Sequence, residues 1–194
     1  MSQLVMHRPK LDELPEINCP EGYHLRHFED GDAAGWNALL DVAFERKEGT
    51  SDFDNDMATD DAYRPERVWF ICTDDGQIVA TASCWQNEMY GKVTSFIHWV
   101  AADTEHGGKK LGHWVSLATL HQARREGRLD MTLSTDDVRI PAIKTYLRLG
   151  FLPAITDDSH AERWKLVLET MDWPERFEAI IEGPIKTYPL IDFK

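Results

Sequence analysis

The region from residue 102 to residue 151 constrains the possible folds of this chain more than any other part of the sequence. It contains, in order, a loop rich in Gly and Lys at 103–110, a helix-length run at 111–127, a short apolar strand at 129–135 and a second helix-length run at about 139–149. Together with the strand before the loop, this order predicts one βαβ unit. A helix N-terminus carries unpaired N–H groups and a partial positive charge, so the unit favours an anion at the start of its first helix.

The loop before that helix has the residue types of a phosphate-binding cradle. Gly107 and Gly108 allow the backbone to approach an anion closely, and Lys109 and Lys110 add positive charge to a chain whose formal net charge is -13. The loop is not a P-loop, because no Gly-Lys-Ser/Thr ends it, and it lacks the Gly-x-Gly-x-x-Gly dinucleotide fingerprint. The residues alone leave two interpretations open: a phosphate cradle, or an ordinary turn with two solvated lysines.

The second half of the region resembles a known family. The run Ala-Ile-Lys-Thr-Tyr-Leu-Arg-Leu-Gly-Phe at 142–151 closely resembles the Ala-Ile-x-Leu-Tyr-x-x-x-Gly-Phe run of the GNAT family of N-acetyltransferases. The loop upstream resembles that family's acyl-CoA signature, Arg/Gln-x-x-Gly-x-Gly/Ala, with Gly112 in the last position. Two positions depart from the signature, since Gly107 replaces Arg or Gln and Lys110 replaces the first Gly. Arg139 occupies the position of the usual Asn before the Ala-Ile pair.

The resemblance covers residues 22–168 and implies the fold class. GNAT proteins are α/β (α+β) domains with a mixed, mostly antiparallel sheet, in which a central β-α-β acyl-CoA-binding unit is flanked by helices. We therefore expect a single GNAT acetyltransferase domain over residues 1–194, with a core at about 22–169 and a C-terminal extension at 170–194.

The resemblance also implies an enzyme, an acyltransferase that uses acetyl-CoA as co-substrate and acetylates an amine by direct attack. We expect the acceptor to be the primary amine of a small molecule. Two alternatives stay open: acetylation of a protein or peptide, and a non-catalytic acyl-CoA-binding protein on the same fold, which the altered loop would favour. The acceptor rests on analogy, because a fold shared this widely does not determine function.

Three residues are candidates for catalysis. The motif match places Tyr146 where GNAT enzymes often keep a tyrosine near the thioester sulfur, so we expect it to protonate the leaving thiolate; the alternative is a residue that only packs or hydrogen-bonds the cofactor. His98 is the preferred base, because the family often has Glu or His on this strand and an ordinary histidine pKa of about 6.5 allows proton acceptance at neutral pH. A core histidine is the alternative. Glu88, in the preceding turn, is the second choice for the base.

The residues expected to bind the cofactor lie on one strand edge, on the loop and at one helix start. The resemblance places the pantetheine arm along the strand edge at Val100, Ala101 and Ala102, and the pyrophosphate at the loop. The loop set is Gly107, Gly108, Lys109, Lys110, Leu111 and Gly112. Arg139 is the further candidate, either as a ligand of CoA phosphates or as a solvated side chain.

Hydrophobic periodicity predicts the elements outside this region. Residues 1–21 are expected to form an extended lead-in, because Pro9, Pro15 and Pro20 disfavour a helix or a central strand. The other expected elements are a strand at 23–28, a helix at about 32–46, strands at 67–73 and 77–85 joined by an Asp-Gly turn, a strand at about 92–102, and a final strand pair at 152–155 and 164–168. Strict alternation would place His98, Val100 and Ala102 on one face of strand 92–102, and Trp99 and Ala101 on the other.

Two segments keep more than one interpretation. Residues 47–65 are rich in Asp and Glu, which indicates either a solvated loop or an acidic lid that attracts an ammonium group. The apolar tail at 171–194, expected to begin with a short helix, packs on its own domain or covers a partner subunit in a homodimer.

Composition excludes several classes of protein. The 34 Asp and Glu residues against 21 Lys and Arg residues argue against a nucleic-acid-binding surface. Cys19, Cys72 and Cys84 have no Cys-x-x-Cys spacing, which favours free thiols in a reducing compartment, and no His or Cys cluster predicts a metal site. The sequence contains no long apolar run or targeting motif, so we expect a cytoplasmic protein that does not associate with membranes.

Overall fold

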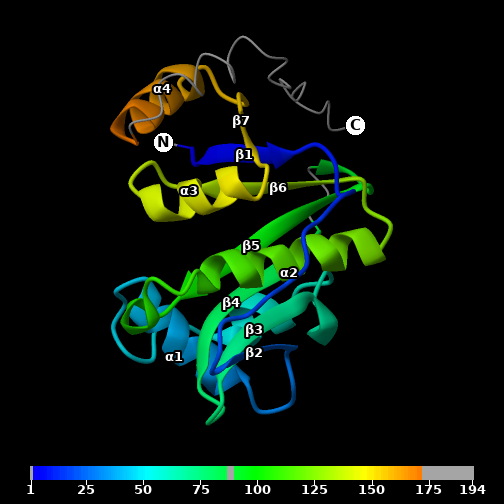
Figure 1. Ribbon diagram of the computed structural model, residues 1–194, viewed down its shortest axis with the longest axis vertical. Coiled ribbons are helices and arrows are strands. Elements are labelled where there is room, and N and C mark those ends of the chain that lie inside the picture. The colour runs from blue at the N-terminus through cyan, green and yellow to red at the C-terminus, as the bar shows by residue number, and fades with distance from the viewer. Residues whose placement is uncertain (1, 87–89, 172–194) are drawn as a thin grey trace.

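The computed structural model describes residues 2–86 and 90–171, which form one seven-stranded sheet covered by helices (Figure 1). The strand order is β2-β3-β4-β5-β6-β1-β7, in which β5 and β6 are parallel and the other neighbouring pairs are antiparallel.

The strands are β1 (Leu4–Arg8), β2 (Tyr23–His27), β3 (Val68–Thr73), β4 (Ile78–Trp85), β5 (Thr94–Ala102), β6 (Asp130–Thr135) and β7 (Leu152–Ala154). The α-helices are α1 (Ala33–Ala43), α2 (Leu111–Arg125), α3 (Ile140–Arg148) and α4 (His160–Thr170). Short helical turns are η1 (Asp54–Ala58), η2 (Pro65–Arg67) and η4 (Thr104–His106). The expected mixed, mostly antiparallel sheet and the central β5-α2-β6 unit are confirmed.

Helices α1 and α2 cover opposite faces of the sheet. On β3, Phe70 packs with the α1 residue Trp36, whereas its neighbours Trp69 and Ile71 pack with α2. This alternation is that of a strand buried on both faces. The turn between β3 and β4 contains Gly76 with a φ of 91°, in agreement with the predicted Asp-Gly hairpin.

The N-terminal segment is extended at Leu4–Arg8, as expected, but it forms a strand in the interior of the sheet, so the expectation that it would not form a central strand was wrong. β1 pairs antiparallel with β6, where Met6 lies opposite Leu133, and on its other side with β7. Leu4 and Met6 have no exposed surface. The first of the prolines that argued against a central strand, Pro9, comes directly after β1 ends. The core therefore begins well before residue 22.

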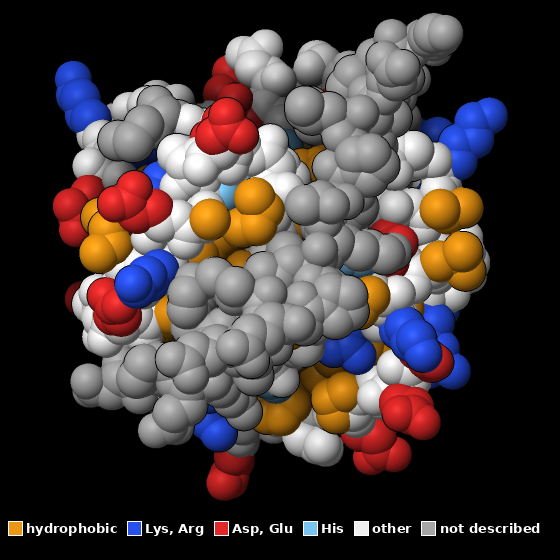
Figure 2. Space-filling model, turned by 90° about the horizontal axis from the view of Figure 1, so that it is seen from above, with side chains coloured by type: hydrophobic (Ala, Val, Ile, Leu, Met, Phe, Trp, Pro, Cys, Tyr) orange, Lys and Arg blue, Asp and Glu red, His pale blue; other side chains and the backbone are white. Residues whose placement is uncertain are grey.

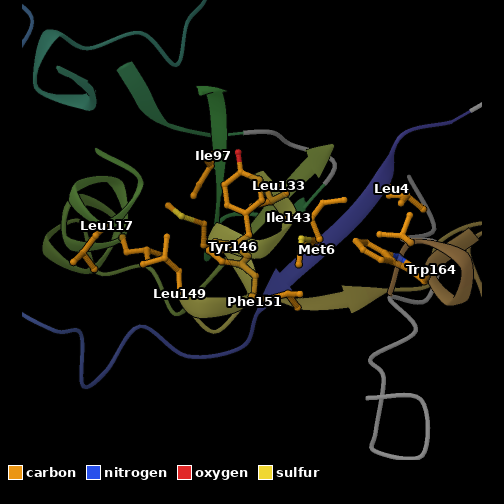
Figure 3. Packing of buried hydrophobic residues seen from close by; sticks show 14 of the residues in the cluster. Leu4, Met6, Ile97, Leu117, Leu133, Ile143, Tyr146, Leu149, Phe151 and Trp164 are labelled. Carbon is orange, nitrogen blue, oxygen red and sulfur yellow. The ribbon is translucent and has the colours of Figure 1, made fainter. Parts of the chain in front are cut away.

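The segment that was expected to end the sheet, residues 164–168, is part of helix α4 instead. Trp164, Val167 and Leu168 are buried, and their spacing is that of one helix face. Figure 3 shows Trp164 beside Leu4 of β1, in the same hydrophobic cluster. The strand next to β7 in the sheet is therefore β1, from the other end of the chain.

Strand β5 contains a β-bulge at Trp99. Between the pairs His98–Ser83 and Ala101–Thr81, β5 has one residue more than β4. Trp99 has a φ of 48°, in the left-handed region that side chains rarely adopt.

The bulge corrects the predicted faces of this strand. His98 and Trp99 both lie on the α1 face, where His98 contacts the rings of Trp85 and Phe96 and Trp99 packs with the α1 cluster. Val100 packs with the α2 cluster on the opposite face. Strict alternation holds up to His98 and fails beyond it, because the extra residue reverses the order.

The C-terminal tail from residue 172, with its predicted short helix, lies outside the described residues, as do residues 1 and 87–89. None of the helices in the described part combines the length and the hydropathy needed to cross a membrane. The view from the α4 end shows acidic and basic side chains interspersed around the rim of that face (Figure 2).

Candidate active site

A pocket opens where β5 and β6 separate. The two strands pair from Thr94 with Asp130 to Ile97 with Leu133, and β5 then continues to Ala102 with β4 as its partner. The space between the separated strands belongs to a pocket of about 690 Å³ that also reaches α3 and the end of α1. The edge of β5 beyond Ile97 thus faces a cavity rather than a neighbouring strand.

The predicted pantetheine edge lies in this wall. Val100, Ala101 and Ala102 all line the pocket. Because β6 does not pair with this part of β5, backbone groups on that edge are available to a ligand. A bound extended chain could therefore pair with the strand as a partner strand would.

The predicted cradle follows β5 and ends at the start of α2. Within the described chain, the backbone N–H groups of 108–112 donate to no other backbone group, whereas those of His113 and Trp114 donate to the Lys110 carbonyl at 3.0 and 3.1 Å. Free donors at a helix start, together with the helix dipole, favour an anion there. Leu111 adds only its backbone, because its side chain is buried in the core.

Two glycines of the cradle are needed for its shape. Gly108 has a φ of 79°, and a Cβ added to Gly107 would lie 3.0 Å from the Thr104 carbonyl oxygen. A side chain at either position would therefore strain the loop. Gly112 has open space around it and is the cradle residue that lines the pocket.

The two lysines of the cradle have different environments. Lys110 caps the N-terminus of α2 with φ 58° and ψ 29°, so it holds the left-handed conformation that the family's usual Gly would adopt without strain. Lys109 extends toward β2, where its Nζ lies 5.6 Å from the ring centroid of Tyr23. The hydroxyl of Tyr23 in turn hydrogen-bonds His106 Nδ1 at 2.8 Å.

Tyr146 enters the pocket from α3. Its side chain is buried among Ile97 and Leu133, and Figure 3 shows the ring between these two residues. Burial raises the pKa of Tyr146 above its ordinary value, and the charge of Arg139 only partly opposes this. The phenol is therefore protonated at neutral pH, and its hydroxyl has no hydrogen-bond partner among the described residues.

Arg139 lies at the start of α3 in the pocket wall. Its Nε donates to Asp136 Oδ2 at 2.9 Å, and its Cζ lies 4.7 Å from the ring centroid of Phe44. Phe44 follows the end of α1, so this contact joins the α1 and α3 sides of the pocket.

His98 lies in an aromatic environment on the α1 side of the pocket. Its ring centroid is 5.3 to 5.9 Å from those of Trp85, Phe96 and Trp99. Burial lowers the pKa of His98 to about 4, although the charges of Asp60 and Asp56 act in the opposite direction. Its Nδ1 is buried without a hydrogen-bond partner in the described part of the chain. His98 is consequently neutral at pH 7 and free to accept a hydrogen bond.

The structure thus brings His98, Tyr146, Arg139 and the pantetheine edge into one pocket, while Glu88 lies outside the described residues. The described residues contain no cluster of three or more side chains suited to a metal ion. The sequence analysis missed Phe44 and Arg46, which also line the pocket. The one feature of the sequence that could have indicated them was their position just after the last buried turn of α1.

Residues 33–151 match the model of the acetyltransferase (GNAT) family. The chain belongs to this family. The match includes the β5-α2-β6 unit, the cradle and the Tyr-Gly-Phe motif, so the family resemblance seen in the motifs is confirmed.

Curated relatives and solved structures agree with this assignment. A mycothiol acetyltransferase from Nocardioides sp. is 27% identical over 183 residues, which cover 81% of this chain and 59% of that protein. One from Thermobispora bispora is 31% identical over 157 residues, covering 75% of this chain and 52% of that protein. The chain therefore spans about half the length of the curated relatives it matches.

Two solved structures illustrate the shared fold. A GCN5-related N-acetyltransferase from Sphaerobacter thermophilus superimposes with a TM-score of 0.63 at 22% identity, over 79% of this chain and 49% of that one. A GNAT family N-acetyltransferase from Escherichia coli, solved in complex with CoA, has a TM-score of 0.55 at 18% identity, over 70% of this chain and 72% of that one. At these identities the likeness concerns the fold.

Proposed function

We propose that this GNAT protein transfers an acetyl group from acetyl-CoA to the primary amine of a small molecule. The observation that carries the proposal is the pocket between β5 and β6, which joins an unpaired strand edge to His98 and Tyr146. The family membership and the relatives named mycothiol acetyltransferase support acetyl transfer, and that name favours a small-molecule acceptor over a protein.

Acetyl-CoA is the co-substrate in this proposal. The free N–H groups of 108–112 and the charge of Lys110 receive the pyrophosphate, and the β5 edge at 100–102 receives the pantetheine arm. Arg139, which lines the pocket, adds a positive charge. The bulge at Trp99 breaks the regular pairing of β5 beside the position where the thioester would lie, so a strand N–H there can polarise its carbonyl.

The reaction requires the amine in its neutral form. The nitrogen lone pair attacks the thioester carbonyl, a C–N bond forms, and the C–S bond then breaks to release CoA thiolate. Attack makes the nitrogen positively charged and far more acidic than the free ammonium, so the weakly basic His98 can take that proton at this stage. Tyr146 holds a proton that it donates toward the leaving sulfur, as a hydrogen bond or by full transfer.

The first experiment is calorimetric titration with acetyl-CoA and with free CoA, followed by an amine screen for turnover. We expect micromolar binding and acetylation of at least one amine. His98→Gln and Tyr146→Phe should reduce turnover while acetyl-CoA binding persists. Binding without turnover of any amine would favour the non-catalytic alternative, and the absence of binding would show that Gly107 and Lys110 have disabled the cradle. Peptide substrates in the same screen test the protein-acetylation alternative, and light scattering tests the alternative in which the tail covers a partner subunit in a homodimer.

A further inference from the structure

We propose that the acceptor carries a carboxylate as well as its amine, and that Arg46 binds this carboxylate. The inference rests on the proposed acetyl transfer and narrows its acceptor to amino-acid-like molecules.

Arg46 presents a guanidinium in the pocket wall without a described carboxylate partner. Its Cζ lies 5.2 Å from the ring centroid of Phe44 and 5.3 Å from that of Trp99, and its Nη1 donates to Ser51 Oγ at 3.1 Å. The remaining donors of the fork have no partner in the described part of the chain. The arginines that do form ion pairs with Asp or Glu are Arg26, Arg67, Arg128, Arg139 and Arg163. In a chain with net charge -13, an arginine free of acidic partners inside the pocket is available for a ligand.

The loop that carries Arg46 is held in place by a buried carboxylate. Asp41 accepts hydrogen bonds from the backbone N–H groups of Gly49 at 2.7 Å, Thr50 at 3.2 Å and Ser51 at 2.9 Å. Burial opposes ionisation of Asp41, but these hydrogen bonds outweigh it and lower its pKa. Because Ser51 also accepts from Arg46, the loop orders the guanidinium before any ligand arrives, which reduces the entropic cost of binding.

A second guanidinium lies on the same ring. Arg139 Cζ is 4.7 Å from the centroid of Phe44, the ring that Arg46 also contacts. Asp136 already accepts a hydrogen bond from Arg139 Nε, so the positive charge of Arg46 is less neutralised than that of Arg139. A planar guanidinium fork matches the two oxygens of a carboxylate. This end of the pocket is therefore cationic.

The His98 end of the pocket lies in the field of two carboxylates that are not part of the pocket lining, and their charge favours a positive group there. Asp56 and Asp60, on and just after η1, exert their negative charge on His98. Trp99 contacts both groups, since its ring centroid is 5.3 Å from the His98 ring centroid and 5.3 Å from Arg46 Cζ. An acceptor that spans the indole would place its amine near His98 and its carboxylate at Arg46. Asp136, which also lines the pocket, disfavours a multiply charged anion such as phosphate.

The test compares carboxylates with their esters. Acetylation of glycine, β-alanine, leucine and phenylalanine is measured beside that of each methyl ester, in the wild type, Arg46→Gln and Arg46→Lys. We expect Arg46→Gln to lower kcat/KM for the acids about tenfold or more, mainly through KM, and to leave the esters within about twofold. Arg46→Lys should recover part of the loss, because it keeps the charge. For each substrate, kcat/KM of the variant is divided by that of the wild type, which removes the effect of the different amine basicity of acids and esters.

Two controls separate this inference from the proposed function. Arg64→Gln removes an exposed arginine outside the pocket and should change neither class of substrate. Acetyl-CoA affinity should be the same in Arg46→Gln as in the wild type. Equal losses on acids and esters, or a wild type that acetylates only amines without a carboxylate, would overturn the inference.

A binding measurement covers the case in which no amine is acetylated. The same four acids are titrated into protein saturated with free CoA. Binding that is lost in Arg46→Gln would support carboxylate recognition and reject only the catalytic proposal. If no acid binds and none is acetylated, carboxylate recognition is rejected as well.

Discussion

His98 and Trp99 are adjacent in the sequence and nevertheless project from the same face of the sheet, with ring centroids 5.3 Å apart. A regular strand would place them on opposite faces. The bulge at Trp99, where φ is 48°, brings both into the pocket wall. The histidine gains an apolar neighbour there and becomes a group that is difficult to protonate.

The burial of His98 should make the protein sensitive to acid. Its pKa is lowered to about 4, so the folded state takes up this proton less readily than the unfolded chain, whose histidine pKa is about 6.5. Burial of neutral His98 therefore costs no stability above pH 6.5, and the free energy of unfolding falls as the pH drops toward 4. We expect wild type to lose on the order of 3 kcal/mol more than His98→Phe over this range.

Urea denaturation at pH 7.5 and pH 4.5 measures this difference. Comparing the change with pH, rather than the absolute stability, removes the packing effect of the new side chain. His24→Gln, at an exposed position on β2, is the matched control and should behave as wild type. An equal loss in the free energy of unfolding between the two pH values for wild type and His98→Phe would contradict a lowered pKa of His98.

Removal of the Tyr146 hydroxyl should affect turnover and not folding. The phenol is buried with no described hydrogen-bond partner, so Tyr146→Phe leaves no polar group unpaired. We expect kcat to fall by about 10² or more if the hydroxyl acts as the acid, with the acetyl-CoA affinity nearly unchanged. Steady-state kinetics with calorimetry distinguishes this from a binding role, in which affinity would fall and kcat would persist. Tyr63→Phe, outside the pocket, is the control.

Replacement of Lys110 by Gly should relieve strain at the start of α2. Lys110 has a φ of 58°, which costs a residue with a Cβ about 1 kcal/mol relative to Gly. We expect Lys110→Gly to be more stable by about 0.5 to 1 kcal/mol.

Two substitutions of Lys110 distinguish the effect of its Cβ on cofactor binding from the effect of its positive charge. Lys110→Ala keeps the Cβ and removes the charge, whereas Lys110→Gly removes both. Calorimetric affinity for CoA should be higher in the Gly variant than in the Ala variant if backbone approach matters. The reverse order would mean that the cradle does not need a glycine at this position.

Truncation of Met6 should test the place of β1 in the core. Met6 has no exposed surface and lies opposite Leu133 of β6 and Pro153 of β7. Met6→Ala should cost about 2 to 5 kcal/mol in the free energy of unfolding, as expected for a buried side chain. Val138→Ala, at 84% exposure, should change stability by less than about 0.5 kcal/mol. Similar values for the two variants would contradict an interior strand.

The sequence by itself determined the features that depend on neighbours along the chain. The order of strand, Gly-Lys loop, helix and strand predicted the βαβ unit, and the motif at 142–151 placed Tyr146 on the helix that lines the pocket. The Asp-Gly turn predicted the β3–β4 hairpin. Such signals are local, because caps, turns and periodicity act over a few residues.

Only the tertiary structure decided which distant segments meet. β1 fills a place between β6 and β7, more than a hundred residues away in sequence, and local propensity cannot specify a partner strand. The bulge at Trp99 depends on the register with β4, and the placement of Phe44 and Arg46 depends on how α1 packs across the sheet. The Gly-Lys loop and the helix that follows it could be predicted from their residues, but the environment of His98 and Arg46 in the pocket arises from contacts among α1, β5 and the loop after α1 that form only when the chain folds.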